Sequence, residues 1–283
     1  MTPAEQLWMD HSLTIAAAQF SPGPDEAENE RTVSRLAARL AQKGAQVIAF
    51  PEYSHYFNRQ LGPDFVEHAQ DMDGSFVSCL SQLAQKHGVT LIAGFGERVP
   101  DSDRVYNTVV AVGPDGLVRT TYRKVHLFDA FGFQESQWVQ PGDLDQMPVL
   151  EISGLTFGLQ TCYDLRFPEV TRRLVSHGAE VVVLPAQWVP GSFKEHHWNV
   201  LLQARAIENI VYMVGAGQCM PFGVGRSAII DPQGYVLAQA GADEGFAIVD
   251  VDAPHLAVAR GTNPAWELRR YRVVPQESAS ADV

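Results

Sequence analysis

The chain has 283 residues, of which 46 % are hydrophobic and 19 % charged, so it has enough apolar material for one large α/β domain or two small ones. Its formal net charge of −12 argues against wide binding to nucleic acid or to an anionic membrane, but leaves the charge of a small substrate open. The opening residues MTPAEQLWMD do not read as a signal peptide, and no apolar run is long enough to span a bilayer. We therefore expect a cytoplasmic protein.

The first half of the chain alternates between strand and helix patterns. Apolar residues recur at helical spacing over residues 28–43 and again over residues 75–88, and a glycine closes each run. The expected strands occupy residues 13–20, 45–50, 90–99, 105–116 and 117–125, with a Pro-Asp-Gly turn joining the last two.

The second half repeats this rhythm without an exact sequence repeat. Expected strands cover residues 155–162, 180–188, 211–219 and 226–241, and expected helices cover residues 168–178 and 193–209. This alternation predicts an α/β fold in which helices cover a sheet. Since no linker divides the chain, we expect one domain over residues 1–272 and a disordered tail over residues 273–283.

Three of the predicted strands end near a polar residue that a core would not favour: Glu52, Lys124 and Cys162. Ligand sites in α/β sheets gather at the carboxyl ends of strands. A thiol can serve there as nucleophile, a carboxylate as its base, and an ammonium as a stabiliser of negative charge on a carbonyl oxygen. The simpler alternatives are an ordinary ion pair between Glu52 and Lys124 and a cysteine that only fills space.

The other two cysteines fit that simpler role. Cys79 shares a predicted helix face with Phe76 and Leu80, and Cys219 follows an apolar strand. An odd number of cysteines without a CxxC motif indicates neither a disulfide framework nor a zinc ribbon, and we expect no metal.

The segments around the three polar residues, FPEYS, YRKVHLFD and CYDLRFPE, resemble in this order the nitrilase superfamily of carbon–nitrogen hydrolases. QESQWVQPGD resembles the segment that carries the family's second glutamate, here Glu135. The resemblance covers roughly residues 13–272 and is strongest to the Nit branch, whose members are amidases of small dicarboxylic-acid amides. It implies a four-layer α-β-β-α sandwich, a homodimer or larger homo-oligomer, and catalysis without a cofactor.

The resemblance also implies a role for each site residue. Glu52 is the general base for Cys162, whose thiolate attacks the amide carbon and forms a thioester. Lys124 and the backbone N–H of Tyr163 stabilise the oxyanion, and Glu135 positions Lys124 and the substrate nitrogen. Water then releases the acid.

Further residues are expected around this centre. Arg166 either pairs with a nearby carboxylate of the protein or binds a substrate carboxylate through a bidentate pair of hydrogen bonds. The Nit resemblance favours the second role. Tyr53, Trp188 and His55 are expected at the rim of the pocket. Only ten residues separate Lys124 from Glu135, fewer than in many Nit-like sequences, and this short loop should border the pocket.

The histidines offer weaker alternatives. His126 lies near Lys124 and would suit a Cys–His hydrolase, although the resemblance favours a structural role. His196 and His197 are adjacent on a predicted helix and therefore point to different faces, which disfavours a shared metal ion.

The leading functional hypothesis is a small-molecule amidase of the omega-amidase type, acting on 2-oxoglutaramate or 2-oxosuccinamate. Deaminated glutathione is the second candidate substrate. An N-carbamoyl amino acid hydrolase, a nitrilase and a catalytically idle scaffold remain as alternatives.

Overall fold

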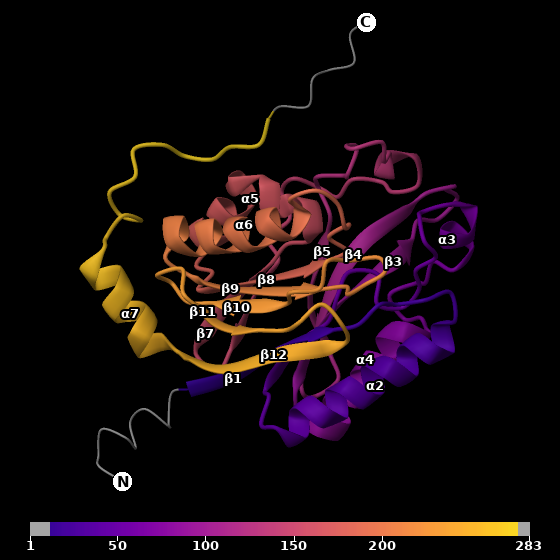
Figure 1. The fold of residues 1–283 in the computed structure, drawn as a ribbon, viewed down its shortest axis with the longest axis horizontal. Coiled ribbons are helices and arrows are strands. Elements are labelled where there is room, and N and C mark those ends of the chain that lie inside the picture. Colours follow the sequence, from indigo (N-terminus) through magenta and orange to yellow (C-terminus); the bar gives the residue numbers. More distant parts are fainter. Residues whose placement is uncertain (1–11, 277–283) are drawn as a thin grey trace, which may run out of the picture.

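The computed structural model describes residues 12–276, which form two six-stranded sheets packed face to face. Figure 1 shows α5 and α6 on one outer side and α2 and α4 on the other, with both sheets between them. The expected four-layer α-β-β-α sandwich is confirmed. The predicted disordered tail lies largely outside the described residues, and its described part, residues 273–276, has neither helix nor strand.

The first sheet has the strand order β12-β1-β2-β3-β4-β5. Its strands are β1 (Ser12–Gln19), β2 (Val47–Ala49), β3 (Thr90–Arg98), β4 (Val105–Val112), β5 (Val118–Arg123) and β12 (Gly245–Asp252). The central strands β1, β2 and β3 are parallel, whereas β4, β5 and β12 join antiparallel. Its outer face packs against α2 (Glu26–Gln42) and α4 (Ser75–His87).

The second sheet has the order β6-β7-β8-β9-β10-β11. Its strands are β6 (Val149–Ile152), β7 (Leu155–Leu159), β8 (Val181–Ala186), β9 (Tyr212–Gly217), β10 (Ala228–Ile230) and β11 (Val236–Gln239). Strand directions follow the same pattern as in the first sheet, so the two halves of the chain repeat in topology. Its outer face packs against α5 (Pro168–Ser176) and α6 (Lys194–Asn209).

The core between the sheets is made of alternate strand residues. Ile15, Val47 and Ile92 on the first sheet and Phe157 and Val183 on the second belong to one buried cluster. Successive strand residues point to opposite faces, so the other set packs under the helices. Both faces of each central strand are therefore largely apolar, and Glu52, Lys124 and Cys162 lie beyond the strand ends.

Two strands and two α-helices had no counterpart in the sequence prediction: β6, β12, α3 (Pro63–Glu67) and α7 (Ala253–Thr262). Strand β12 pairs with β1 along all eight residues. Helix α7 begins directly after it, where the Asp252 side chain accepts a hydrogen bond from the backbone N–H of His255. No helix between residues 12 and 276 is long and apolar enough to cross a membrane.

Candidate active site

Glu52 lies three residues beyond the end of β2, and its side chain is 1 % exposed. The chain turns here beside Gly94 of β3, where a Cβ atom would come within 2.7 Å of the Cα atom of Glu52. Tyr53 continues the turn with a φ of 56°, a left-handed conformation that is costly for a residue with a side chain. The fold therefore holds Glu52 in place through its backbone.

Lys124 follows the last residue of β5 and reaches two carboxylates. Its Nζ lies 3.1 Å from Oε1 of Glu52 and 2.8 Å from Oε2 of Glu135. Burial lowers the pKa of Lys124, but the charges of Glu135 and Glu52 outweigh that effect, so its pKa lies well above the usual range. Lys124 is thus a permanent cation between two acids.

Glu135 begins a short 3₁₀ helix (Glu135–Gln137) and is fixed by four donors. Its Oε2 accepts the backbone N–H of Phe128 at 2.6 Å as well as Lys124, and its Oε1 accepts the Tyr53 hydroxyl at 2.8 Å. The Asn107 side chain also donates to Oε1, at 3.2 Å.

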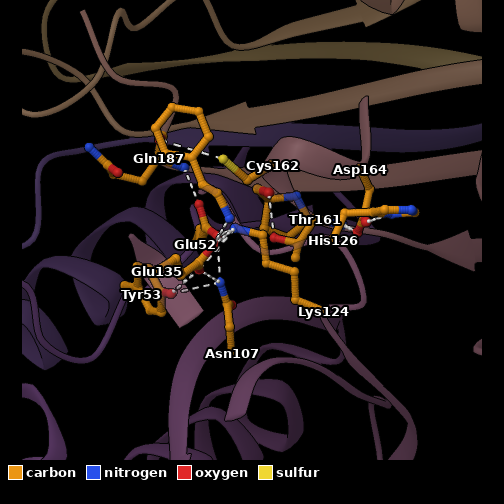
Figure 2. Close-up of polar contacts among 12 residues, drawn as sticks. Glu52, Tyr53, Asn107, Lys124, His126, Glu135, Thr161, Cys162, Asp164 and Gln187 are labelled. Carbon is orange, nitrogen blue, oxygen red and sulfur yellow. Dashed lines mark hydrogen bonds and ion pairs between the residues drawn. The ribbon is translucent and has the colours of Figure 1, made fainter. Parts of the chain in front are cut away.

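Asn107, near the start of β4, was not singled out in the sequence. Its Nδ2 lies 2.6 Å from Oε1 of Glu52 and 2.8 Å from the Tyr53 hydroxyl. The side chain is fully buried. Asn107 therefore orients the base and the second glutamate together, as Figure 2 shows.

Cys162 opens a 3₁₀ helix (Cys162–Arg166) after β7, three residues beyond the end of that strand. Its φ of 45° is again left-handed. Burial and then the negative charge of Glu52 raise the pKa of the Cys162 thiol well above its usual value, against the effect of Lys124. The resting group is therefore a thiol, and its activation needs a base that accepts the proton during the reaction.

Gln187, directly after β8, binds both the base and the thiol through its backbone. Its N–H donates to Oε2 of Glu52 at 2.6 Å, and its carbonyl oxygen accepts from Sγ of Cys162 at 3.5 Å. Figure 2 shows Cys162 and Gln187 on one side of Glu52 and Asn107 on the other. Sequence reasoning did not find Gln187, because a backbone contact has no signature in residue type.

Asp164 holds the turn that carries the thiol. Its buried carboxylate accepts hydrogen bonds from the Tyr122 hydroxyl at 2.7 Å and from the backbone N–H of Thr161 at 3.0 Å. It also contacts Nδ1 of His126 at 2.9 Å. Because Tyr122 belongs to β5, this cluster ties the Cys162 turn to the segment that carries Lys124.

A cavity of about 550 Å³ is lined by Glu52, Lys124, Glu135 and Cys162. The loop of residues 128–134, which was expected to border the pocket, contributes to its wall. A second, smaller recess also contains Cys162. It is lined further by Tyr163, Arg166, Trp188 and Lys194 together with Phe128, Gln187 and Val189.

The remaining expected residues fall into two groups. Tyr53 lines the larger cavity, and Trp188 lines the smaller recess. The placement of His55 at the rim was wrong: it is fully buried, accepting from the N–H of Gly96 at 3.3 Å and contacting the carbonyl oxygen of His68 at 3.2 Å. Its aromatic neighbours, Phe65, Phe76 and Phe95, make it a core residue.

The other polar residues near the thiol do not form a metal centre. Nδ1 of His197 lies 3.3 Å from a guanidinium nitrogen of Arg166. Between residues 12 and 276, no three His, Cys, Asp or Glu side chains are grouped so that they could hold a metal ion. The groups that the described site does bring together are a thiol, two carboxylates and an ammonium.

Known proteins of one family resemble this chain in sequence and in fold. The family model described as carbon–nitrogen hydrolase matches residues 14–260. The chain is 35 % identical over 260 residues to a deaminated glutathione amidase of Escherichia coli O157:H7, covering 92 % of this chain and 98 % of that protein. It is also 35 % identical over 274 residues to an omega-amidase of Xenopus tropicalis, covering 91 % and 95 %.

Solved structures show the same fold. The C. elegans NitFhit protein superposes with a TM-score of 0.86 at 27 % identity, covering 93 % of this chain and 67 % of that one. Saccharomyces cerevisiae Nit3, a member of branch 10 of the nitrilase superfamily, gives a TM-score of 0.82 at 25 % identity, covering 92 % and 97 %.

Proposed function

This chain belongs to the carbon–nitrogen hydrolase family and acts on amides, and from that premise we propose that it hydrolyses a small carboxylate-bearing amide through a thioester on Cys162. The observation that carries the proposal is the buried cluster of Glu52, Lys124 and Glu135 beside that thiol in one cavity. A protonated thiol next to an oriented carboxylate requires general-base activation.

The first half of the reaction transfers the acyl group. The Cys162 proton moves to Glu52 as the sulfur attacks the amide carbon, and the carbonyl oxygen becomes an oxyanion. Lys124 supplies positive charge to that oxygen, and the N–H of Tyr163, in the first turn of a 3₁₀ helix, supplies a donor. Glu52 then gives its proton to the nitrogen as the carbon–nitrogen bond breaks, and the amine leaves.

The second half returns the enzyme to its resting state. A water molecule attacks the thioester carbon while Glu52 takes one of its protons. The carbon–sulfur bond breaks, the sulfur regains a proton from Glu52, and the acid departs. In both halves, Glu135 and Asn107 keep Lys124 and Glu52 in position through the hydrogen bonds described above.

The proposed substrate is an amide of the omega-amidase type, 2-oxoglutaramate or 2-oxosuccinamate. Arg166 supports it, because its guanidinium lies in the recess that shares Cys162 and can bind a carboxylate with two hydrogen bonds. A relative named omega-amidase is 35 % identical to this chain.

The cavity volume favours deaminated glutathione as a second candidate. This compound presents the same 2-oxoglutaryl group as 2-oxoglutaramate but releases a dipeptide instead of ammonia. A cavity of about 550 Å³ is large for a leaving group the size of ammonia and falls within the range of drug-sized ligand sites. The E. coli relative carries this substrate in its name.

Formation of 2-oxoglutarate from the two candidates tests the proposal directly. Wild type and Cys162→Ala are given 2-oxoglutaramate, deaminated glutathione, an N-carbamoyl amino acid and an aliphatic nitrile, and both the acid and the amine are measured. We expect wild type to hydrolyse at least one of the 2-oxoglutaryl amides and Cys162→Ala to hydrolyse none. Preference for the carbamoyl compound or the nitrile would contradict the substrate class, and no turnover of any compound would favour the scaffold alternative.

A further inference from the structure

Lys194, the first residue of α6, is a largely buried lysine that the reaction scheme does not use. The residue is 7 % exposed and lines the recess shared with Cys162. Its Nζ lies 3.6 Å from the centre of the Phe131 ring and 5.1 Å from that of Phe128. Within residues 12–276 it forms no hydrogen bond or ion pair with a carboxylate, so aromatic faces are its described partners.

Arg166 places a second cation in the same recess. Its guanidinium carbon lies 4.9 Å from the centre of the Trp188 ring, and its Nε is buried without a hydrogen-bond partner among the described residues. The neighbouring acid on α6, Glu195, is bound to Arg226 at 2.8 Å and does not compensate either group.

The electrostatic state of Lys194 reflects this missing partner. Burial and then the positive charge of Arg166 lower its pKa below the usual value for a lysine. Buried charges are normally paired, because removing them from water costs free energy that an opposite charge must offset. The recess has a volume of only about 10 Å³, so an anion reaches both cations only by displacing part of the surrounding side chains, and it would then supply that charge to both at once.

We infer that Lys194 is a specificity residue that joins Arg166 in an anion subsite for the carboxylate of the substrate's acyl group. This inference rests on the proposed function and deepens it. The carboxylate replaces the ring of Phe131, which is 67 % exposed, as the partner of the ammonium. A cation–π contact at such an exposed ring is weaker than a charge-assisted hydrogen bond in a desolvated recess.

A matched pair of substrates tests the inference. 2-Oxoglutaramate carries the carboxylate, and 4-oxopentanamide carries a methyl group in its place. We expect Lys194→Met to raise KM for 2-oxoglutaramate by roughly 10- to 100-fold, in line with the loss of one charged hydrogen bond, and to reduce the preference for the anionic substrate accordingly. Lys194→Arg should retain most of that preference, and Lys86→Met, a change of an exposed lysine on α4, should leave it as in wild type.

A binding measurement separates this inference from the proposed reaction. Calorimetry with 2-oxoglutarate is carried out on Cys162→Ala and on the same protein with Lys194→Met added, and we expect binding to weaken by roughly 10- to 100-fold. The role of Lys194 would be overturned if Lys194→Met raised KM equally for 2-oxoglutaramate and 4-oxopentanamide. Unchanged binding of 2-oxoglutarate would overturn it as well. Weakened binding in a protein that hydrolyses no amide would instead overturn the proposed reaction while supporting the subsite.

Discussion

Nζ of Lys124 lies 3.1 Å from Oε1 of Glu52, and neither side chain is more than 2 % exposed. The same ammonium lies 2.8 Å from Glu135, so one cation separates two buried carboxylates. With a protonated Cys162, these four groups carry a net charge of −1, and a thiolate would make it −2. The cluster therefore keeps its thiol neutral until the proton can move to Glu52.

Removing the cation should destabilise the fold as well as stop the reaction. Lys124→Met leaves Glu52 and Glu135 side by side without compensation, and breaking a buried ion pair typically costs about 3–5 kcal/mol. Adding Glu135→Gln should recover part of the free energy of unfolding but no activity. Urea unfolding and amide hydrolysis measure the two effects. A Lys124→Met protein as stable as wild type would show that the cluster is not charged as described.

Asn107→Ala should lower kcat more than it raises KM, because Asn107 orients Glu52 and does not line the cavity. A lost buried hydrogen bond of about 1–3 kcal/mol corresponds to roughly a 5- to 150-fold lower kcat if it is felt mainly in the transition state. Steady-state kinetics check this, with Asn199→Ala on the exposed side of α6 as the control. An effect confined to KM would argue against a positioning role.

Gly94→Ala tests whether the backbone places the base. The new methyl group would come within 2.7 Å of the Cα atom of Glu52 and 3.0 Å of the backbone nitrogen of Tyr53, and neither atom can move without shifting the turn. We expect a loss of stability of about 1–3 kcal/mol together with reduced kcat. Gly261→Ala on α7 is the matched control, since its methyl group would meet nothing within 4 Å. Full activity in Gly94→Ala would be inconsistent with this account.

The pH dependence of stability should carry the signature of His55. Burial lowers its pKa to about 3, compared with about 6.5 in the unfolded chain. The unfolded chain therefore binds more protons between these values, and the free energy of unfolding should fall as the pH drops from 6.5 toward 3. This single group accounts for about 1.4 kcal/mol per pH unit in that window.

His55→Gln should remove this contribution. The difference in free energy of unfolding between wild type and variant should therefore become smaller as the pH falls. Denaturant unfolding of both proteins at several pH values between 7 and 4 measures the difference. If the free energies of unfolding of the two proteins changed equally with pH, His55 would not be buried as a neutral ring.

The sequence predicted the residues of the site better than the contacts that hold them. Glu52, Lys124 and Cys162 could be found because charged or reactive residues next to apolar strands are locally unusual. The face-to-face sheets were expected only through the family resemblance, since alternating strands and helices also suit a single sheet. Gln187 acts through its backbone, which no residue pattern reveals.

Two further residues show where local patterns fail. His55 follows the site glutamate closely and was placed at the rim, but the turn directs its ring into an aromatic core. Lys194 reads as an ordinary surface lysine at a helix start, and its burial depends on aromatic residues distant in the sequence, Phe128 and Phe131 among them. Long-range packing decides both cases.

The most direct test of the central claim is mass mapping of the enzyme after acid quenching during turnover of 2-oxoglutaramate or deaminated glutathione. We expect the peptide containing Cys162 to gain the mass of the substrate's acyl group, and Cys79 and Cys219 to gain none. The same adduct should form from both substrates, since they share that group. Turnover that persists in Cys162→Ala, or an acyl group found on another residue, would contradict the mechanism.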